Sequence, residues 1–263
     1  HLEVGIAEQN MIGTTVGIAA TGKVAVAKSF ARFFERAYDQ IEMGAYSQAN
    51  FKVVGSHVGI SIGADGTSQM ALADCGFMRA IPNSVVLCPS DYVSAFKLTQ
   101  EMLNYHGFCY MRTYRSAQPI LYSKEESFPI GDFKVLRSGK EGCVTVLSCG
   151  FVLHEAIKAA LYMENEGIPV CLIDAYSLKP FPHEKLKKLC ESLQTHHVFT
   201  LEDHYESGGL GDVILEALNG SAIRVHKLAV KDFPESGSTQ DLLATYGIDA
   251  QALIKQITDV WNR

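Results

Sequence analysis

The stretch Gly5-Ile6-Ala7-Glu8-Gln9-Asn10-Met11 places a single glutamate at the start of a long run of small and apolar residues. The segment 6–21 is rich in Gly, Ala and Thr, and it predicts a helix with Glu8 in its first turn. Acidic residues are common in that turn because they interact favourably with the positive end of the helix dipole. A carboxyl group beside apolar residues can instead serve as a functional acid, since burial favours its protonated form. Taken alone, the stretch favours the first interpretation.

Short apolar and β-branched runs alternate with helical segments from this stretch to about residue 118. Strands are expected at 23–27, 51–55, 84–87 and 108–111, and Leu2 and Val4 resemble part of a further strand. Helices are expected at 31–49, 68–79 and 91–105, and a glycine-rich loop at 55–66. Alternation of this kind predicts a layered α/β domain with a parallel sheet.

A break in the pattern at 116–131, rich in Ser, Pro, Lys, Glu and Gly, precedes a second α/β unit. Its strands are expected at 143–149, 170–173, 198–201 and 223–228. The helix after the first of these strands has an apolar face formed by Leu153, Ala156, Ile157, Ala160 and Leu161. Asp249 is expected to cap a final helix. The sequence therefore predicts two consecutive three-layer α/β domains with mostly parallel sheets, at 1–118 and 141–263, joined by a linker at 119–140.

The composition excludes several classes of function. The 263 residues carry 23 basic and 29 acidic side chains, for a net charge of −6. The sequence has no basic cluster that would predict nucleic-acid binding. It also has no run of about 20 uncharged apolar residues that would predict a membrane span. Seven scattered cysteines include no Cys-x-x-Cys pair, so we expect reduced, buried thiols in a cytoplasmic protein. Because the chain begins at His1 without a methionine, we expect it to be part of a longer polypeptide.

Several long blocks of the sequence resemble the transketolase family. They are GIAEQNM (5–11), SFARFFERAYDQI (29–41), GSHVGISIGADGTSQMALAD (55–74), PSD (89–91) and LEDHYESGGLGD (201–212). The resemblance runs from about residue 5 to the end and implies the family's pyrimidine-binding domain followed by its C-terminal domain. The family's diphosphate-binding domain, with its Gly-Asp-Gly and later Asn, has no counterpart here. The first strand and helix of the pyrimidine-binding domain are also expected upstream of His1.

The resemblance implies an activity, cofactors and partners. The activity is thiamine-diphosphate-dependent transfer of two-carbon ketol units between sugar phosphates, in the pentose phosphate pathway. Mg²⁺ or Ca²⁺ would be held by the diphosphate-binding half, so no metal ligand is expected in this chain. The implied partner is a diphosphate-binding domain or subunit, in a homodimer or a heterotetramer, and the chain alone would be inactive.

The resemblance also implies roles for residues around the cofactor. Glu8 matches the glutamate that hydrogen-bonds N1′ of the aminopyrimidine ring, which reverses the interpretation of Glu8 as a simple helix-end residue. Phe30 and Phe33 match the aromatic wall around that ring, although such side chains are more often core residues. Phe34 is expected in the core.

Four further positions match the family's substrate side. His57 would act in catalysis and contact the sugar phosphate, and Asp65 would contact a substrate hydroxyl. Gln69 would lie between cofactor and substrate, at a position where some relatives have His. Arg115 matches the family's phosphate-binding arginine, since a guanidinium grips phosphate oxygens through paired donors.

Two other features have weaker functional interpretations. Arg112 is expected to support the site or the fold rather than bind substrate. The segment Glu202-Asp203-His204 precedes a glycine-rich turn at 208–211, and such a turn before a helix could bind phosphate. We interpret it as structural and in contact with the neighbouring domain, with His204 as a minor site candidate.

Three alternatives remain open from the sequence. Deoxyxylulose-phosphate synthase and the β subunits of 2-oxo acid dehydrogenases share the Ile-Ala-Glu-Gln block and the cofactor. The pairing of His57 with Asp65, and the EDHYESGG block, favour transketolase over both. The third alternative is a non-catalytic, transketolase-like protein that binds a partner without turnover.

Overall fold

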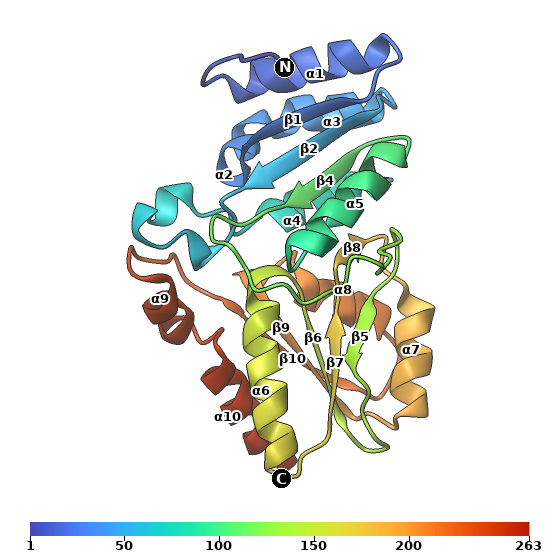
Figure 1. Ribbon diagram of the computed structural model, residues 1–263, viewed down its shortest axis with the longest axis vertical. Coiled ribbons are helices and arrows are strands. Elements are labelled where there is room, and N and C mark those ends of the chain that lie inside the picture. The colour runs from blue at the N-terminus through green and yellow to red at the C-terminus, as the bar shows by residue number, and fades with distance from the viewer. Residues whose placement is uncertain (263) are drawn as a thin grey trace.

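A computed structural model of the protein describes residues 1–262 and contains two five-stranded sheets flanked by helices (Figure 1). The strand orders are β1-β2-β4-β3-β8 and β10-β9-β6-β7-β5. Strands β8 and β5 run antiparallel to their neighbours, whereas all other neighbouring strands pair in parallel. The predicted class of two mostly parallel α/β sheets is therefore confirmed.

The first domain supplies four strands and the helices around them. Its strands are β1 Ala25–Phe30, β2 Phe51–Ser56, β3 Val85–Leu87 and β4 Cys109–Arg112. Its helices are α1 Glu8–Ala20, α2 Ala31–Phe34, α3 Tyr38–Tyr46, α4 Asp74–Ala80 and α5 Tyr92–Asn104. Helix α1 packs against β1, the edge strand of this sheet, at the top of Figure 1. Asp91 begins α5 as an N-cap, because its Oδ1 accepts a hydrogen bond from Ser94 N at 2.7 Å.

The second domain repeats the architecture. Its sheet contains β5 Lys134–Arg137, β6 Val144–Ser148, β7 Val170–Asp174, β9 His197–Tyr205 and β10 Arg224–Val230. Its helices are α6 Leu153–Asn165, α7 His183–Ser192, α8 Leu210–Ala217, α9 Thr239–Thr245 and α10 Ala250–Trp261. Asp249 caps α10 as predicted, since its Oδ1 accepts from Ala252 N at 2.8 Å. On α6, Ala156 and Ala160 are buried as predicted, but Leu161 is 44% exposed.

One strand crosses between the domains. Strand β8, Ser177–Lys179, belongs to the second domain by sequence but pairs antiparallel with β3 at the edge of the first sheet. Lys179 Nζ donates to the carbonyl oxygens of Arg79 at 2.7 Å and Ile81 at 2.6 Å. Apolar side chains of both domains also belong to one contiguous core cluster. The domain interface is therefore an extension of the core.

Local predictions failed where the backbone tightens into 3₁₀ turns. The segment predicted as one helix at 31–49 consists of α2, a 3₁₀ turn at Glu35–Ala37, and α3. Residues three apart lie on the same side of such a turn, so Phe34 and Ala37 are both fully buried. The helix predicted at 68–79 begins only at Asp74, after two 3₁₀ turns at Ile60–Asp65 and Thr67–Gln69.

Two boundaries also differ from the sequence prediction. Residues 1–7 form no strand, so Leu2 and Val4 do not continue one in this structure. Strand β5 lies inside the predicted linker at 119–140 and pairs with β7 in the second sheet. None of its four residues is buried, and the short segment Lys-Val-Leu-Arg gave no continuous apolar run that could be recognised in the sequence.

The structure also bears on the cysteines and on membrane crossing. Within residues 1–262 all seven cysteines are buried and free of disulfides, as expected for reduced thiols. No helix in that range combines the length and the apolar character needed to cross a membrane.

Candidate cofactor and substrate site

The carboxyl ends of neighbouring parallel strands converge at one edge of the first sheet. Phe30 at the end of β1 lies opposite Ser56 at the end of β2, and Gly55 of β2 lies opposite Arg112 at the end of β4. His57 follows β2 directly. Parallel α/β sheets bind ligands at this edge because the strand ends and their loops present polar side chains there.

Glu8 begins α1 and is 5% exposed. Ser29 Oγ donates to Glu8 Oε1 at 3.4 Å, whereas Oε2 accepts no hydrogen bond from residues 1–262. The guanidinium of Arg36 lies near this oxygen, with Nη1 3.9 Å from Oε2. Buried polar atoms usually have a hydrogen-bond partner. The free Oε2 is therefore available to accept a hydrogen bond from a donor group or a protonated nitrogen of a ligand.

An aromatic row, which we define as His57, Phe30 and Phe33, adjoins the region of Glu8. The rings of Phe30 and Phe33 are nearly parallel, with an interplanar angle of 6° and centroids 5.7 Å apart. The His57 ring stacks on Phe30 with centroids 3.8 Å apart, and the Arg36 guanidinium lies 5.2 Å from the Phe33 centroid. The row offers flat, half-buried surface suited to a flat heteroaromatic ring. Phe34, by contrast, is fully buried in the core, as predicted.

His57 is held in an unusual backbone conformation. Its φ of +59° lies in the left-handed region, which a side chain other than Gly adopts at a cost of roughly 1–3 kcal/mol. Burial lowers the pKa of His57 below its ordinary value, and the guanidinium of Arg115 lowers this pKa further. The imidazole is therefore favoured in its neutral form, which can accept a hydrogen bond or a proton from a ligand.

Asp65 and Arg115 meet across the same region. Arg115 Nη1 lies 2.9 Å from Asp65 Oδ1, in an ion pair whose side chains are 51% and 36% exposed. An exposed ion pair contributes little to stability, so both side chains can exchange partners at small cost. Gln69 ends the second 3₁₀ turn and is half-buried. The structure thus brings Glu8 together with Phe30, Phe33 and His57, and Asp65 together with Arg115; the roles of these residues stay predictions.

The loop that carries His57, Asp65 and Gln69 is braced by the second domain. Asp203 Oδ1 accepts from Ile60 N at 2.8 Å, and Thr239 Oγ1 donates to Ser61 O at 3.0 Å. Figure 1 shows this loop, in cyan, next to α9.

Glycine is required where this loop approaches Asp203. Gly59 has a φ of +72°, and a Cβ there would lie 1.9 Å from Asp203 Oδ2. Ile60 and Ile62 of the same loop pack into the core of the second domain. The second domain therefore fixes the loop both by hydrogen bonds and by apolar contact.

Arg112 supports the fold, as predicted, and does not face the ligand region. It is 2% exposed and donates to both carboxylate oxygens of Asp74, at 2.8 and 3.0 Å. Its Nη2 also donates to the carbonyl oxygens of Ala71 and of Asp203 in the second domain, at 3.3 and 3.1 Å. Tyr110 donates to Asp74 Oδ2 at 2.6 Å. This buried pair links β4 and α4 to the second domain.

The glycine-rich turn before α8 is structural, as predicted, because the backbone N–H groups of Gly208, Leu210 and Gly211 already donate to carboxylates. Glu202 accepts from the backbone N–H groups of Leu210 and Gly211, at 2.6 and 2.8 Å, so a carboxylate occupies the place where a phosphate would bind. Arg79 of the first domain donates to the carbonyl oxygen of Gly208 at 2.6 Å. The predicted contact with the neighbouring domain is therefore confirmed.

His204 is 1% exposed, and burial lowers its pKa to about 4. It lies on β9, within reach of Asp74 and Cys75. The carboxylate of Asp74 is already paired with Arg112, which disfavours a cation there. A residue so deeply buried is unsuited to contact a sugar substrate.

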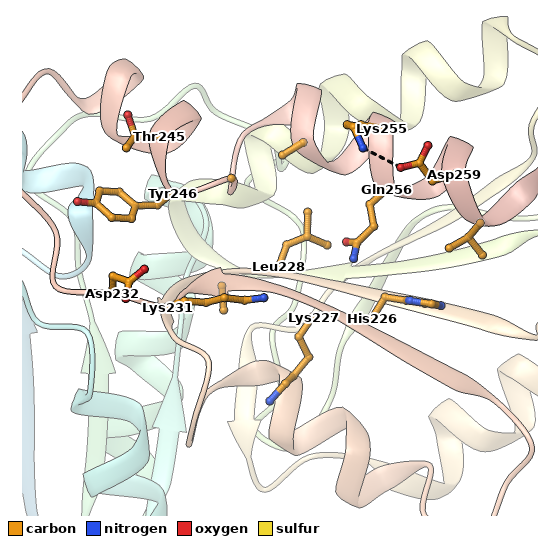
Figure 2. A pocket seen from close by; sticks show the side chains of 14 residues that line it. His226, Lys227, Leu228, Lys231, Asp232, Thr245, Tyr246, Lys255, Gln256 and Asp259 are labelled. Atoms are coloured by element: carbon orange, nitrogen blue, oxygen red, sulfur yellow. Dashed lines mark hydrogen bonds and ion pairs between the residues drawn. The ribbon is translucent and has the colours of Figure 1, made fainter.

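A cavity of about 680 Å³ lies in the second domain, along β10 and beneath α10 (Figure 2). It contains none of the predicted site residues. Its three lysines each have a carboxylate partner: Lys227 pairs with Asp212, Lys231 with Glu206, and Lys255 with Asp259. Within residues 1–262 the lysines of this cavity are thus neutralised by carboxylates, so the cavity offers no unpaired lysine to attract an anionic ligand.

Three residues of the site were not recognised from the sequence. Ser29 and Ser56 contact Glu8 and His57, and Arg36 lies near both Glu8 and Phe33. Serines at the ends of strands are common and gave no signal of their own. Arg36 lies in the 3₁₀ turn between α2 and α3. The sequence pattern predicted a continuous helix there, so the position of Arg36 could not be inferred.

Comparisons with known proteins agree with this arrangement. Residues 1–119 match the family model of the transketolase pyrimidine-binding domain, and residues 131–253 match that of the transketolase C-terminal domain. The chain is 41% identical over 259 residues to human transketolase-like protein 2 and 40% identical over 258 residues to rat transketolase. These alignments cover 98% and 97% of the chain but 41% of each relative. The chain thus spans about two fifths of the length of these relatives.

Solved structures show the same relationship. A split-gene transketolase, described as an inactive β4 tetramer, superposes with a TM-score of 0.89 at 33% identity, covering 97% of this chain and 82% of that one. Transketolase from Campylobacter jejuni superposes with a TM-score of 0.85 at 20% identity, covering 98% of this chain and 39% of that one, which supports the fold alone. The two matched domains, their order and the identity to named relatives lead to one conclusion: the chain belongs to the transketolase family and comprises its pyrimidine-binding and C-terminal domains.

Proposed function

We propose that this chain is the C-terminal half of a thiamine-diphosphate-dependent transketolase, which transfers two-carbon ketol units between sugar phosphates of the cytoplasmic pentose phosphate pathway. The observation that carries the proposal is the buried Glu8 carboxylate, whose Oε2 accepts no hydrogen bond within residues 1–262, next to the aromatic row. An acceptor beside a flat apolar wall fits an aminopyrimidine ring. Membership of the transketolase family supports the same cofactor.

Glu8, Phe30 and Phe33 would hold the pyrimidine end of the cofactor. Thiamine diphosphate, when bound, supplies the carbanion chemistry that ketol transfer requires. Glu8 would share a proton with N1′ through the free Oε2, while Ser29 keeps the other carboxylate oxygen in place. Phe30 and Phe33 would exclude water from this contact and fix the plane of the ring. The diphosphate and its Mg²⁺ or Ca²⁺ would be held by the other half of the enzyme.

The substrate side would be formed by His57, Asp65 and Arg115, with Gln69 toward the cofactor. The neutral imidazole of His57 would accept a hydrogen bond from the sugar phosphate or a substrate hydroxyl. Arg115 would leave Asp65 to grip phosphate oxygens, and Asp65 would then be free to contact a hydroxyl group. These few local charges would explain how a chain with a net charge of −6 binds an anionic substrate.

Arg115→Ala should lower kcat/KM for phosphorylated sugars by roughly 10- to 100-fold, the range expected for a lost charge-assisted hydrogen bond. Steady-state kinetics on phosphorylated and unphosphorylated acceptors would measure the effect. The unphosphorylated acceptor should be little affected. Arg137→Ala, which removes another half-exposed arginine paired with a glutamate, is the matched control. An equal loss for both acceptors would instead indicate a structural role for Arg115.

The experiment that tests the proposal is complementation. Residues 1–263 alone should show no transketolase activity, because they contain neither a diphosphate site nor a metal site of the family. Addition of a separately expressed diphosphate-binding half of a transketolase should produce activity and binding of thiamine diphosphate, measured by a coupled assay and by calorimetry. The solved relative described as inactive is likewise a β4 assembly of a split-gene transketolase.

Two outcomes would contradict the proposal. Turnover by the isolated chain would show that the missing half is not required. A stable complex that binds thiamine diphosphate but never turns over sugar phosphates would favour a non-catalytic binding partner. A heterotetramer of two chains of each kind, seen by light scattering, is the assembly expected for the active form.

A further inference from the structure

Ser56 has two polar contacts that bear on which nitrogen of His57 carries the proton. Ser56 Oγ lies 3.2 Å from the carbonyl oxygen of Ser29 on the neighbouring strand β1. The same Oγ lies 3.0 Å from His57 Nδ1. A hydroxyl group has one hydrogen to donate, whereas a carbonyl oxygen can only accept. When the hydrogen of Ser56 is directed to Ser29 O, the second contact requires His57 Nδ1 to be the donor.

We propose that Ser56 is a positioning residue that holds His57 in the Nδ1–H tautomer and so presents Nε2 as an unprotonated acceptor. The hydrogen bond made by one ring nitrogen of a histidine sets the state of the other. The imidazole stacks on the ring of Phe30, with centroids 3.8 Å apart, and this contact limits its rotation. The left-handed backbone conformation of His57 fixes the direction in which its side chain leaves the main chain. A ring flip that exchanged the nitrogens would break the contact with Ser56.

The arrangement joins the two functional ends of the site. Ser29 contributes its hydroxyl to Glu8 Oε1, at 3.4 Å, and its carbonyl oxygen to Ser56. Because β1 and β2 pair in register, with Ser29 opposite Gly55 and Phe30 opposite Ser56, the sheet itself fixes the spacing of these groups. Glu8 and His57 are thus oriented through a single pair of strands.

A proton-free Nε2 suits the substrate side described above. Such a nitrogen accepts a hydrogen bond from a sugar hydroxyl group or takes its proton, whereas an Nε2–H could only donate. The surrounding charges come from Arg115 and Lys28, which disfavour a second proton on the ring, and from Asp65, which favours it. The importance of Nε2 for turnover rests on the proposed function, but the tautomer itself does not.

The tautomer can be read directly by NMR on the chain labelled with ¹⁵N-histidine. Two-bond ¹H–¹⁵N correlations distinguish a protonated from an unprotonated ring nitrogen, and a His57→Gln variant identifies the His57 signals. Above the pH at which the ring becomes neutral, the native chain and Ser56→Thr should show Nδ1–H, since threonine keeps the hydroxyl. Ser56→Ala should show a shift toward Nε2–H. Far-UV circular dichroism would establish that each variant is folded.

Two NMR results would contradict the role of Ser56. An Nε2–H tautomer in the native chain, or an unchanged tautomer in a folded Ser56→Ala, would overturn the proposal. In the enzyme completed with its diphosphate-binding half, Ser56→Ala should also raise KM for the sugar substrate by about tenfold, the loss expected for one hydrogen bond, and Ser56→Thr should restore it. Failure of complementation would contradict the proposed function while leaving the NMR result to decide the role of Ser56.

Discussion

Glu8→Gln is expected to lower the turnover of the completed enzyme by roughly 10²- to 10⁴-fold, the range typical of a lost acid–base group. Glutamine has the same shape as glutamate and keeps an oxygen that can accept from Ser29 Oγ. It cannot take up and release the proton that Oε2 would share with the cofactor. The loss should therefore appear in kcat, with little change in the free energy of unfolding.

The control for this variant lies close by in the sequence. Glu3→Gln makes the same chemical change on an exposed side chain, and it should leave turnover unchanged. Thermal unfolding of both variants would separate a folding defect from a catalytic one, and calorimetry would show whether cofactor binding survives. Turnover close to that of the native enzyme in Glu8→Gln would remove Glu8 from the proposed chemistry.

The second large effect is expected at the domain interface. Arg112→Ala should lower the free energy of unfolding by about 3–5 kcal/mol, because removing one partner leaves a buried, uncompensated charge on the other. Of its side-chain hydrogen bonds within residues 1–262, Asp74 would keep the one from Tyr110. The loss of Arg112 also removes the donor that reaches the carbonyl oxygen of Asp203 in the second domain. Urea unfolding followed by far-UV circular dichroism would measure the change.

Arg115→Ala is the matched control for this effect on stability. It removes an arginine close in the sequence, and with it an ion pair to Asp65 that is exposed to solvent. Such a pair contributes about 0–1 kcal/mol, so stability should change little although substrate binding suffers. Equal losses of stability in the two variants would contradict the distinction between a structural Arg112 and a functional Arg115.

Much of the fold could be predicted from local sequence patterns. The predicted strands β2, β6 and β7 and the helix α5 agree with the observed ones to within one residue at every end. Their apolar runs and caps are local properties of the chain. Prediction failed at 31–49 and at 68–79, where 3₁₀ turns replace helix. Just before the second of these segments, Gly63 and Gly66 adopt positive φ angles that the apolar pattern does not reveal.

The candidate site was predictable in part. Glu8, Phe30, Phe33, His57, Asp65, Gln69 and Arg115 were selected by resemblance in blocks far apart in the sequence. Apart from Gln69, their grouping around Glu8 and around Arg115 is seen only in the structure. No site role was predicted for Ser29 and Ser56, because a serine acquires such a role only when a specific partner lies within hydrogen-bond distance.

The sequence by itself determined the class of the fold, the order of its two domains and the residue types of the site, because periodicity and motifs depend on neighbours along the chain. Only the tertiary structure decided that β8 joins the first sheet and that Asp203 braces the substrate loop. The same holds for the free Oε2 of Glu8. These features depend on strand register and on buried contacts between residues more than 20 and up to 143 positions apart. Glu8 lies at a helix N-terminus by virtue of its sequence, but its free buried oxygen is a consequence of packing.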